Sequence, residues 1–144
     1  MNNFITLNNV SKSFITNKKI LVLKKINFKF NPGKIYSIVG PSGSGKSTLL
    51  NILSLIDKPS SGFIKINKNI INFFNSSEND KIRAEKIGII YQQNNLLPDF
   101  TALENVYLAR LSLTNNKKNS IDSAKKIIKK MDLFDRINHY PSEL

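Results

Sequence analysis

The residues whose types and spacing could do chemistry lie together in the stretch "GPSGSGKST" at positions 40–48. It fits the pattern G-x-x-x-x-G-K-[ST], in which glycines let the backbone turn tightly and come close to a ligand. Backbone amides of such a loop, and of the helix that follows it, cradle phosphate oxygens. A lysine then faces the β- and γ-phosphates, and a serine hydroxyl binds the bridging Mg²⁺. The pattern therefore predicts a nucleotide-phosphate site formed by Gly40, Pro41, Ser42, Gly43, Ser44, Gly45, Lys46, Ser47 and Thr48.

A phosphate-binding loop does not hydrolyse a nucleotide by itself, because hydrolysis also needs a carboxylate for the metal and a group that orients water. Asp57 follows the helix that begins at the loop, so we expect it at the end of that helix far from the phosphates. Gln92 ends a second apolar segment but is an amide, and His139 has no catalytic partner in the sequence. The residues therefore predict phosphate binding without a complete hydrolytic set.

The elements that must position the loop follow from the apolar pattern around it. Residues 26–30 alternate between apolar and polar, which predicts a half-buried antiparallel strand. A turn at 31–34 and a short apolar segment at 35–39, typical of a buried parallel strand, lead into the loop. Apolar residues at helical spacing follow over 47–56, and alternation returns at 63–67. The loop is thus expected between a strand and a helix.

The second half of the chain is expected to be mainly helical. Residues 75–86 are polar and predict a helix, while the apolar segment 87–91 predicts a second buried parallel strand. "TALE" is a capping-box sequence, in which the Thr101 hydroxyl caps the helix and Glu104 reaches back to the Thr101 amide. We therefore expect a helix to begin at Thr101.

The last predicted helix, at about 120–133, is amphipathic. Its apolar side chains are expected to face inward, and its lysines are expected to form a solvated face rather than a binding site. The inward set is Ile121, Ala124, Ile128 and Met131, and the outward set is Lys125, Lys126, Lys129 and Lys130.

Composition excludes several classes of protein. The 144 residues can form one domain with a core, and the absence of cysteine excludes disulfides and thiolate metal sites. The net charge is +12, but it comes from 19 lysines against 3 arginines. Specific base contacts favour arginine, so we expect no nucleic-acid partner, and an anionic membrane surface suits scattered lysines better. The longest apolar stretch is too short to span a membrane.

The motifs resemble the nucleotide-binding subunit of ATP-binding-cassette (ABC) transporters over the whole chain. The resemblance implies an α/β fold, with a P-loop NTPase core, an N-terminal antiparallel β-subdomain and a helical subdomain. Residues 1–92 would form the β-subdomain and the core through the glutamine-bearing strand. Residues 93–144 would form the glutamine loop and the helical subdomain.

The same resemblance assigns roles to individual residues. Phe14 in "SKSF" stands at the position of the aromatic that stacks on the adenine of ATP. Gln92 in "GIIYQQ" stands where a glutamine touches Mg²⁺ and the attacking water. The resemblance thus implies ATP and Mg²⁺ as cofactors, Lys46 and Gln92 as catalytic residues, and Ser47 and Gln92 as metal ligands.

The stretch "YQQNNLLPDFTALENV" at 91–106 and the ending "HYPSEL" are most similar to the ATP-binding subunit of lipoprotein-releasing (Lol) systems. This resemblance implies a homodimer on the cytoplasmic side of the inner membrane that energises lipoprotein release. Its partners would be integral membrane permease subunits, whose coupling helix meets the loop after Gln92 and the helix from Thr101. ATPase subunits of macrolide-export or cell-division type are the alternatives.

In the family, "PSEL" leads directly into the S-G-G-Q signature, and this chain ends there. The resemblance therefore implies an N-terminal part of an ABC ATPase, without the signature, the acidic metal-binding strand or the switch histidine. We expect these 144 residues alone to bind nucleotide without hydrolysing it. Leu55 and Lys68 stand where the family usually has glycine.

Overall fold

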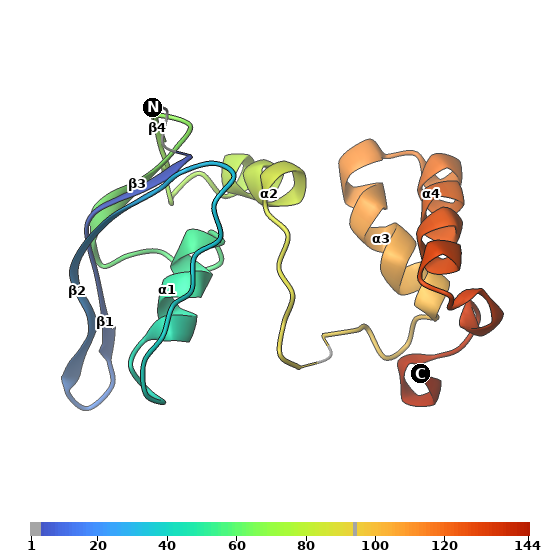
Figure 1. Ribbon diagram of the computed structural model, residues 1–144, viewed down its shortest axis with the longest axis horizontal. Helices are drawn as coiled ribbons and strands as arrows, with labels where there is room; N and C mark the ends of the chain where they lie inside the picture. Colours follow the sequence, from blue (N-terminus) through green and yellow to red (C-terminus); the bar gives the residue numbers. More distant parts are fainter. Residues whose placement is uncertain (1–3, 94) are drawn as a thin grey trace. The chain divides into compact units, whose positions relative to one another are not determined.

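The computed structural model describes residues 4–93 and 95–144. The chain divides into two compact units, one ending at Arg83 and one beginning at Ala84. Figure 1 labels the elements along the chain. The predicted division after residue 92 stays a prediction, because compact units and family subdomains are different divisions.

The first unit is built on one antiparallel sheet. Its strands are β1 (Ile5–Ile15), β2 (Lys19–Phe30), β3 (Ser61–Ile66) and β4 (Asn69–Ile70), in the order β2-β1-β3-β4. Strands β1 and β2 form a hairpin in which Phe14 pairs with Ile20, and β3 pairs antiparallel with the other edge of β1. The predicted strands at 26–30 and 63–67 are confirmed.

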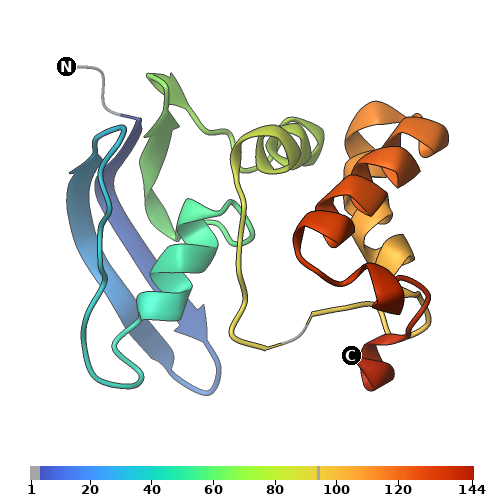
Figure 2. The same cartoon turned by 45° about the vertical axis from the view of Figure 1, so that its right-hand side comes forward.

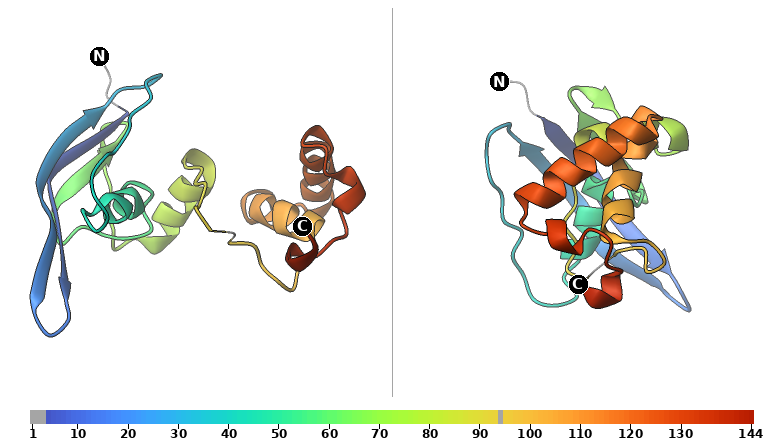
Figure 3. Two further views of the ribbon diagram at one scale, coloured as in Figure 1. Left: turned by 60° about the horizontal axis from the view of Figure 1, so that its bottom comes forward. Right: turned by 90° about the vertical axis from the view of Figure 1, so that its right-hand side faces the viewer.

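Helix α1 (Lys46–Leu53) lies against one face of this sheet, as Figures 2 and 3 show from different directions. Ile52 of the helix is fully buried, and the sheet contributes a matching apolar surface. The helix ends three residues earlier than the apolar spacing predicts. The other buried apolar side chains of this unit are Leu7, Val10, Leu23, Leu55, Ile64, Ile66 and Ile71.

The predicted parallel strands at 35–39 and 87–91 are wrong for this structure, because neither segment is a strand. Their apolar side chains are exposed: Ile35 is 99% exposed, Val39 88% and Ile90 100%. A strand exists only through hydrogen bonds to a neighbour, and a two-stranded pair is barely stable in water. In the described chain the two segments belong to different units and have no strand beside them.

Helix α2 (Ser76–Lys86) confirms the helix predicted at 75–86 and runs across the boundary between the units. Before it, Asn75 accepts a hydrogen bond from the Glu78 amide at 3.2 Å and donates one to the Glu78 carboxylate at 2.9 Å. This side-chain cap was not anticipated from the sequence.

The second unit contains the helices α3 (Ala102–Thr114) and α4 (Lys117–Lys130), followed by the short 3₁₀ helices η1 (Phe134–Arg136) and η2 (Pro141–Glu143). The capping box at the start of α3 is confirmed, with the Glu104 amide donating to the Thr101 hydroxyl at 3.3 Å. The Thr101 amide donates to the Glu104 carboxylate at 2.8 Å. These bonds satisfy backbone donors that the first turn leaves free.

The amphipathic character of α4 is confirmed except at Met131. Ala124 and Ile128 are buried, and the four lysines predicted to face outward are exposed. Met131, predicted to face inward, is 66% exposed, because α4 spans 117–130 and Met131 is its C-cap. The fully buried Ser120 lies on the inner face instead, where its hydroxyl and that of Thr114 lie 3.0 Å apart.

Candidate nucleotide-phosphate site

The predicted phosphate-binding loop enters α1 directly. Gly45 is the N-cap of the helix and has a left-handed backbone, with φ of 91°. Gly43 is also left-handed, with φ of 77°, and the Ser44 amide closes a turn onto the Pro41 carbonyl at 3.3 Å. The first turn of α1, all of whose residues are described, contains no acidic side chain. Its free amides and the positive end of the helix dipole are therefore available to an anion.

Strand β2 sets where this loop can lie. A Cβ atom at Gly45 would come within 3.0 Å of Leu23 Cδ2 and Val22 Cγ1, and within 3.3 Å of the Val22 carbonyl oxygen. A side chain at this position would press on β2, and the left-handed φ of 91° also favours glycine. The motif predicts only tight turning and close ligand approach for Gly45, and its packing against β2 appears only in the structure.

Lys46 bends back over the loop instead of extending into solvent. Its ammonium donates to the Gly40 carbonyl at 3.0 Å and to the Pro41 carbonyl at 2.8 Å. Ser47 is exposed in the first turn of α1, and Thr48 is half-buried. Exposed amides, one ammonium and one hydroxyl fit a polyphosphate, and the Ser47 hydroxyl could provide one oxygen ligand to a Mg²⁺ bound with it.

Phe14 lies near the end of β1, opposite Ile20 of β2. Phe14 as a whole residue is 42% exposed, and the Lys12 ammonium lies over the ring at 5.0 Å from the centroid. Figures 1 and 2 place the β1–β2 turn and the N-terminal end of α1 at the same end of the first unit. The ring thus has free aromatic surface, and its stacking on adenine stays a prediction.

Gln92 is exposed and follows the segment 87–91 in the second unit. Because the loop at 40–48 belongs to the first unit, the predicted sharing of a metal between Ser47 and Gln92 stays a prediction. His139 also lies in the second unit, where its carbonyl accepts from the Ala102 amide at 2.8 Å. Within residues 4–93 and 95–144 no three histidine or carboxylate side chains gather as metal ligands would.

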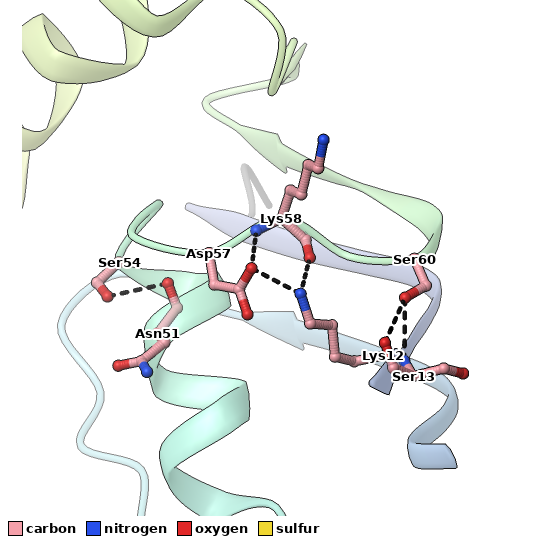
Figure 4. Close-up of polar contacts among 7 residues, drawn as sticks. All are labelled: Lys12, Ser13, Asn51, Ser54, Asp57, Lys58 and Ser60. Carbon is pink, nitrogen blue, oxygen red and sulfur yellow. Dashed lines mark hydrogen bonds and ion pairs between the residues drawn. The ribbon is translucent and has the colours of Figure 1, made fainter. Parts of the chain in front are cut away.

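Asp57 has a partner that the sequence analysis missed. Its carboxylate pairs with the Lys12 ammonium at 2.6 Å, and the same ammonium donates to the Lys58 carbonyl at 2.9 Å (Figure 4). The lysine side chain is only 10% exposed. The sequence places Lys12 two residues before Phe14, but nothing in it indicates that Lys12 pairs with Asp57.

A family model described as "ABC transporter" matches residues 23–144. The chain belongs to the ABC transporter family. It is similar to the lipoprotein-releasing system ATP-binding protein LolD of Rickettsia bellii, with 42% identity over 99% of this chain and 63% of that protein. LolD of Wigglesworthia glossinidia brevipalpis is also 42% identical, over 100% of this chain and 64% of that protein.

Solved structures agree with this family. A dimeric post-hydrolysis state of the ATP-binding cassette MJ0796, bound to ADP and Pi, matches with a TM-score of 0.86 and 38% identity. That match covers 97% of this chain and 62% of the solved one. The α/β P-loop NTPase fold class predicted from the sequence is thereby confirmed. The chain spans 63–64% of the length of the two LolD relatives. In the described residues no helix is long and apolar enough to cross a membrane.

Proposed function

We propose that this chain binds ATP as part of the ATPase subunit of an ABC transporter. The observation that carries the proposal is the loop at 40–48. Two of its glycines are left-handed, and the first turn of the helix that follows has no acidic side chain. The Lys46 ammonium is hydrogen-bonded to the Pro41 carbonyl of the loop. Each of these features favours a bound polyphosphate anion. The family match over residues 23–144 supports the same assignment.

Lys46 would change partners when ATP binds. Its two present acceptors, the carbonyls of Gly40 and Pro41, are neutral. Phosphate oxygens are charged, and a hydrogen bond between two ionised groups is roughly twice as strong as one between neutral groups. The ammonium would therefore pair with phosphate oxygens, and the Ser47 hydroxyl would be one ligand of a Mg²⁺ bound with the nucleotide. In this proposal Phe14 stacks on adenine, and Gln92 contacts the metal and positions the attacking water.

We further propose that the transporter releases lipoproteins from the inner membrane. The support is the identity of 42% to two LolD proteins over nearly all of this chain. The protein would then lie on the cytoplasmic face of that membrane, bound to integral permease subunits. It would pair with a second copy of itself, as in the dimeric structures of MJ0796, the second of which is described as a bacterial ABC transporter cassette.

Two measurements on the natural full-length protein test these proposals separately. Equilibrium binding should show saturable Mg-ATP affinity that inorganic triphosphate competes away, and absence of competition would refute the phosphate site. Affinity purification from membranes should recover permease subunits of a lipoprotein-releasing type. Recovery of macrolide-export or cell-division permeases instead would assign the chain to another exporter while leaving the nucleotide site intact.

A further inference from the structure

The Lys12 side chain crosses from one element of the first unit to another. Its ammonium reaches the Asp57 carboxylate at 2.6 Å and the Lys58 carbonyl at 2.9 Å, although the partners are 45 and 46 residues away in sequence. Its backbone belongs to β1, and its partners follow the C-terminal end of α1 (Figure 4). The lysine side chain is only 10% exposed, and a buried charge needs such partners because leaving it unpaired is strongly destabilising.

Further hydrogen bonds join the same two segments. The Ser60 amide donates to the Ser11 carbonyl at 2.8 Å, and the Ser13 amide donates to the Ser60 hydroxyl at 3.0 Å. We call this set of contacts between residues 11–13 and 57–60 the Lys12 junction. Next along β1 comes Phe14, so the strand is held in place immediately before the ring.

The other side of the Lys12 junction is fixed to the phosphate-binding helix. The amides of Ile56 and Asp57 both donate to the Asn51 carbonyl of α1, at 2.9 and 3.1 Å. The residues after the helix are thus wound back onto its last turn. Helix α1 has eight residues, about 12 Å in length, and begins at Lys46. The Lys12 junction therefore connects the strand that carries Phe14 to the helix that begins at the loop.

Lys12 also touches Phe14 directly, since its ammonium lies over the ring at 5.0 Å from the centroid. A cation at this distance from an aromatic face is attracted to it and restricts where the ring can move. Phe14 as a whole residue is 42% exposed, which leaves it accessible to another partner.

From this arrangement we infer that Lys12 is a positioning residue for nucleotide binding. The base and the phosphates of one nucleotide must reach the Phe14 ring and the loop at 40–48 at the same time. In this inference, Lys12 holds Phe14 at the position where the adenine can stack while the phosphates occupy the loop. The inference rests on the proposed function, and specifically on Phe14 as the residue that stacks on the base. It predicts that Lys12 matters for ligands with a base and not for a bare polyphosphate.

The test compares affinities for Mg-ATP and for inorganic triphosphate in variants of the natural full-length protein. Lys12→Met keeps the apolar stem and removes the charge, and should weaken ATP binding by about three- to tenfold while changing triphosphate binding less than about twofold. Lys12→Arg should recover most of the ATP affinity, because a guanidinium can also pair with Asp57 and stack on the ring. Asp57→Asn, which keeps the lysine, should weaken ATP in the same selective way.

Lys65→Met is the matched control, since Lys65 lies over Phe63 at 5.4 Å on β3 and should leave both affinities unchanged. Equal losses for ATP and triphosphate in Lys12→Met and Asp57→Asn would show a purely structural role and overturn the inference. So would unchanged ATP affinity in both variants. If Lys12→Met does not fold, Asp57→Asn decides the matter by the same selective loss of ATP affinity, which Lys12→Arg should not show. Phe14→Ala distinguishes failure of the proposed base stacking from failure of the Lys12 inference. Unchanged ATP affinity in Phe14→Ala would refute base stacking by Phe14. Weaker ATP binding in Phe14→Ala, with unchanged ATP binding in Lys12→Met, would refute only the role of Lys12.

Discussion

At the scale of single residues, Lys46 shows how the loop at 40–48 is arranged. Its ammonium is held by two backbone carbonyls of the same loop, which keep the positive charge at the place where phosphate would bind. The loop's own backbone therefore positions the lysine charge. Such preorganisation reduces the ordering cost of binding.

Replacement of Lys46 measures this contribution. Lys46→Ala should weaken Mg-ATP binding roughly 10- to 100-fold, the range expected for losing hydrogen bonds to a charged group. It should also abolish any ATPase activity of the natural full-length protein, because the γ-phosphate would lose its facing charge. Isothermal titration gives the affinity, and Lys29→Ala, which removes an exposed lysine of β2, is the control that should bind normally. Unchanged affinity in Lys46→Ala would remove the phosphate assignment.

The two residues at positions where the family usually has glycine both have left-handed backbones. Leu55 has φ of 60° and Lys68 has φ of 73°. Lys68 and Asn67, with φ of 48°, form the two-residue turn between β3 and β4, where Ile66 pairs with Asn69. Two positive φ angles are typical of a type I′ turn, whose preferred sequence is Asn-Gly. A side chain at such a position costs about 1 kcal/mol.

Replacing these residues by glycine should therefore have opposite effects. Lys68→Gly should raise the free energy of unfolding by about 0.5–1 kcal/mol, because the strain is relieved and the exposed side chain loses no packing. Leu55→Gly should lower it by about 2 kcal/mol or more, because Leu55 is only 4% exposed and its buried contacts outweigh the strain. Urea denaturation measures both. Lys65→Gly, within β3, is the control and should destabilise; stabilisation there would mean that relief of strain is not the cause.

At the scale of elements, the capping box makes the stability of the N-terminal end of α3 depend on the protonation of Glu104. Hydrogen bonds from the backbone amide and then from the hydroxyl of Thr101 lower the pKa of Glu104. These bonds favour the carboxylate, so the folded state holds its proton less tightly than the unfolded state does. Their stabilisation is complete above the ordinary glutamate pKa, at about pH 4.3, and is lost as the pH falls through the lower folded pKa.

Acidification below about pH 4.3 should accordingly lower the thermal stability of α3, and Glu104→Gln should flatten this part of the profile, since glutamine can accept the same bonds but does not titrate. Thermal melts followed by circular dichroism from pH 3 to pH 6 would measure this pH dependence of the melting temperature. Glu85→Gln, which removes an exposed carboxylate from α2, should leave the profile unchanged. An unaltered slope in Glu104→Gln would mean that the carboxylate does not stabilise the cap.

Gly62 decides how closely β3 can approach β1. It has φ of 81°, and a Cβ atom there would lie 2.3 Å from the Asn9 carbonyl oxygen and 2.5 Å from that of Asn8. Gly62→Ala should therefore lower the free energy of unfolding by more than about 2 kcal/mol, because rigid backbone would have to move. Gly33→Ala is the matched control, with φ of 70° and open space around its Cβ. It should cost only about 1 kcal/mol of backbone strain, and equal losses in urea denaturation would refute the steric argument.

At the scale of the whole molecule, two apolar segments have side chains without cover. Ile35 and Val39 precede the phosphate loop, and Ile90 precedes Gln92, and all three are almost fully exposed. Apolar segments with unpaired backbone are prone to associate with other chains. The four described strands, β1 to β4, also contain no aspartate or glutamate that could complete the metal ligands or polarise water.

The 144 residues expressed alone should consequently aggregate and should not hydrolyse ATP. Ile35→Lys and Ile90→Lys should each increase the soluble fraction, whereas Ile64→Lys, at a fully buried position of β3, should abolish folding. Sedimentation and phosphate release would measure the two properties. Hydrolysis above background that disappears in Lys46→Ala would show that a catalytic carboxylate is present after all. A sharp melt of a soluble monomer would show that the exposed segments need no cover.

Features that depend only on neighbours along the chain could be predicted from the sequence. The loop at 40–48, the capping box from Thr101 and the alternating strands are local patterns, and the resemblance to ABC transporters followed from them. Tertiary structure decided what depends on distant partners: the pairing of Lys12 with Asp57, the packing of Gly45 against β2, and the exposure of Ile35. An apolar segment such as 35–39 indicates only that its side chains favour burial. Whether it becomes a strand depends on hydrogen bonds to another segment, and in the described chain no strand is there to make them.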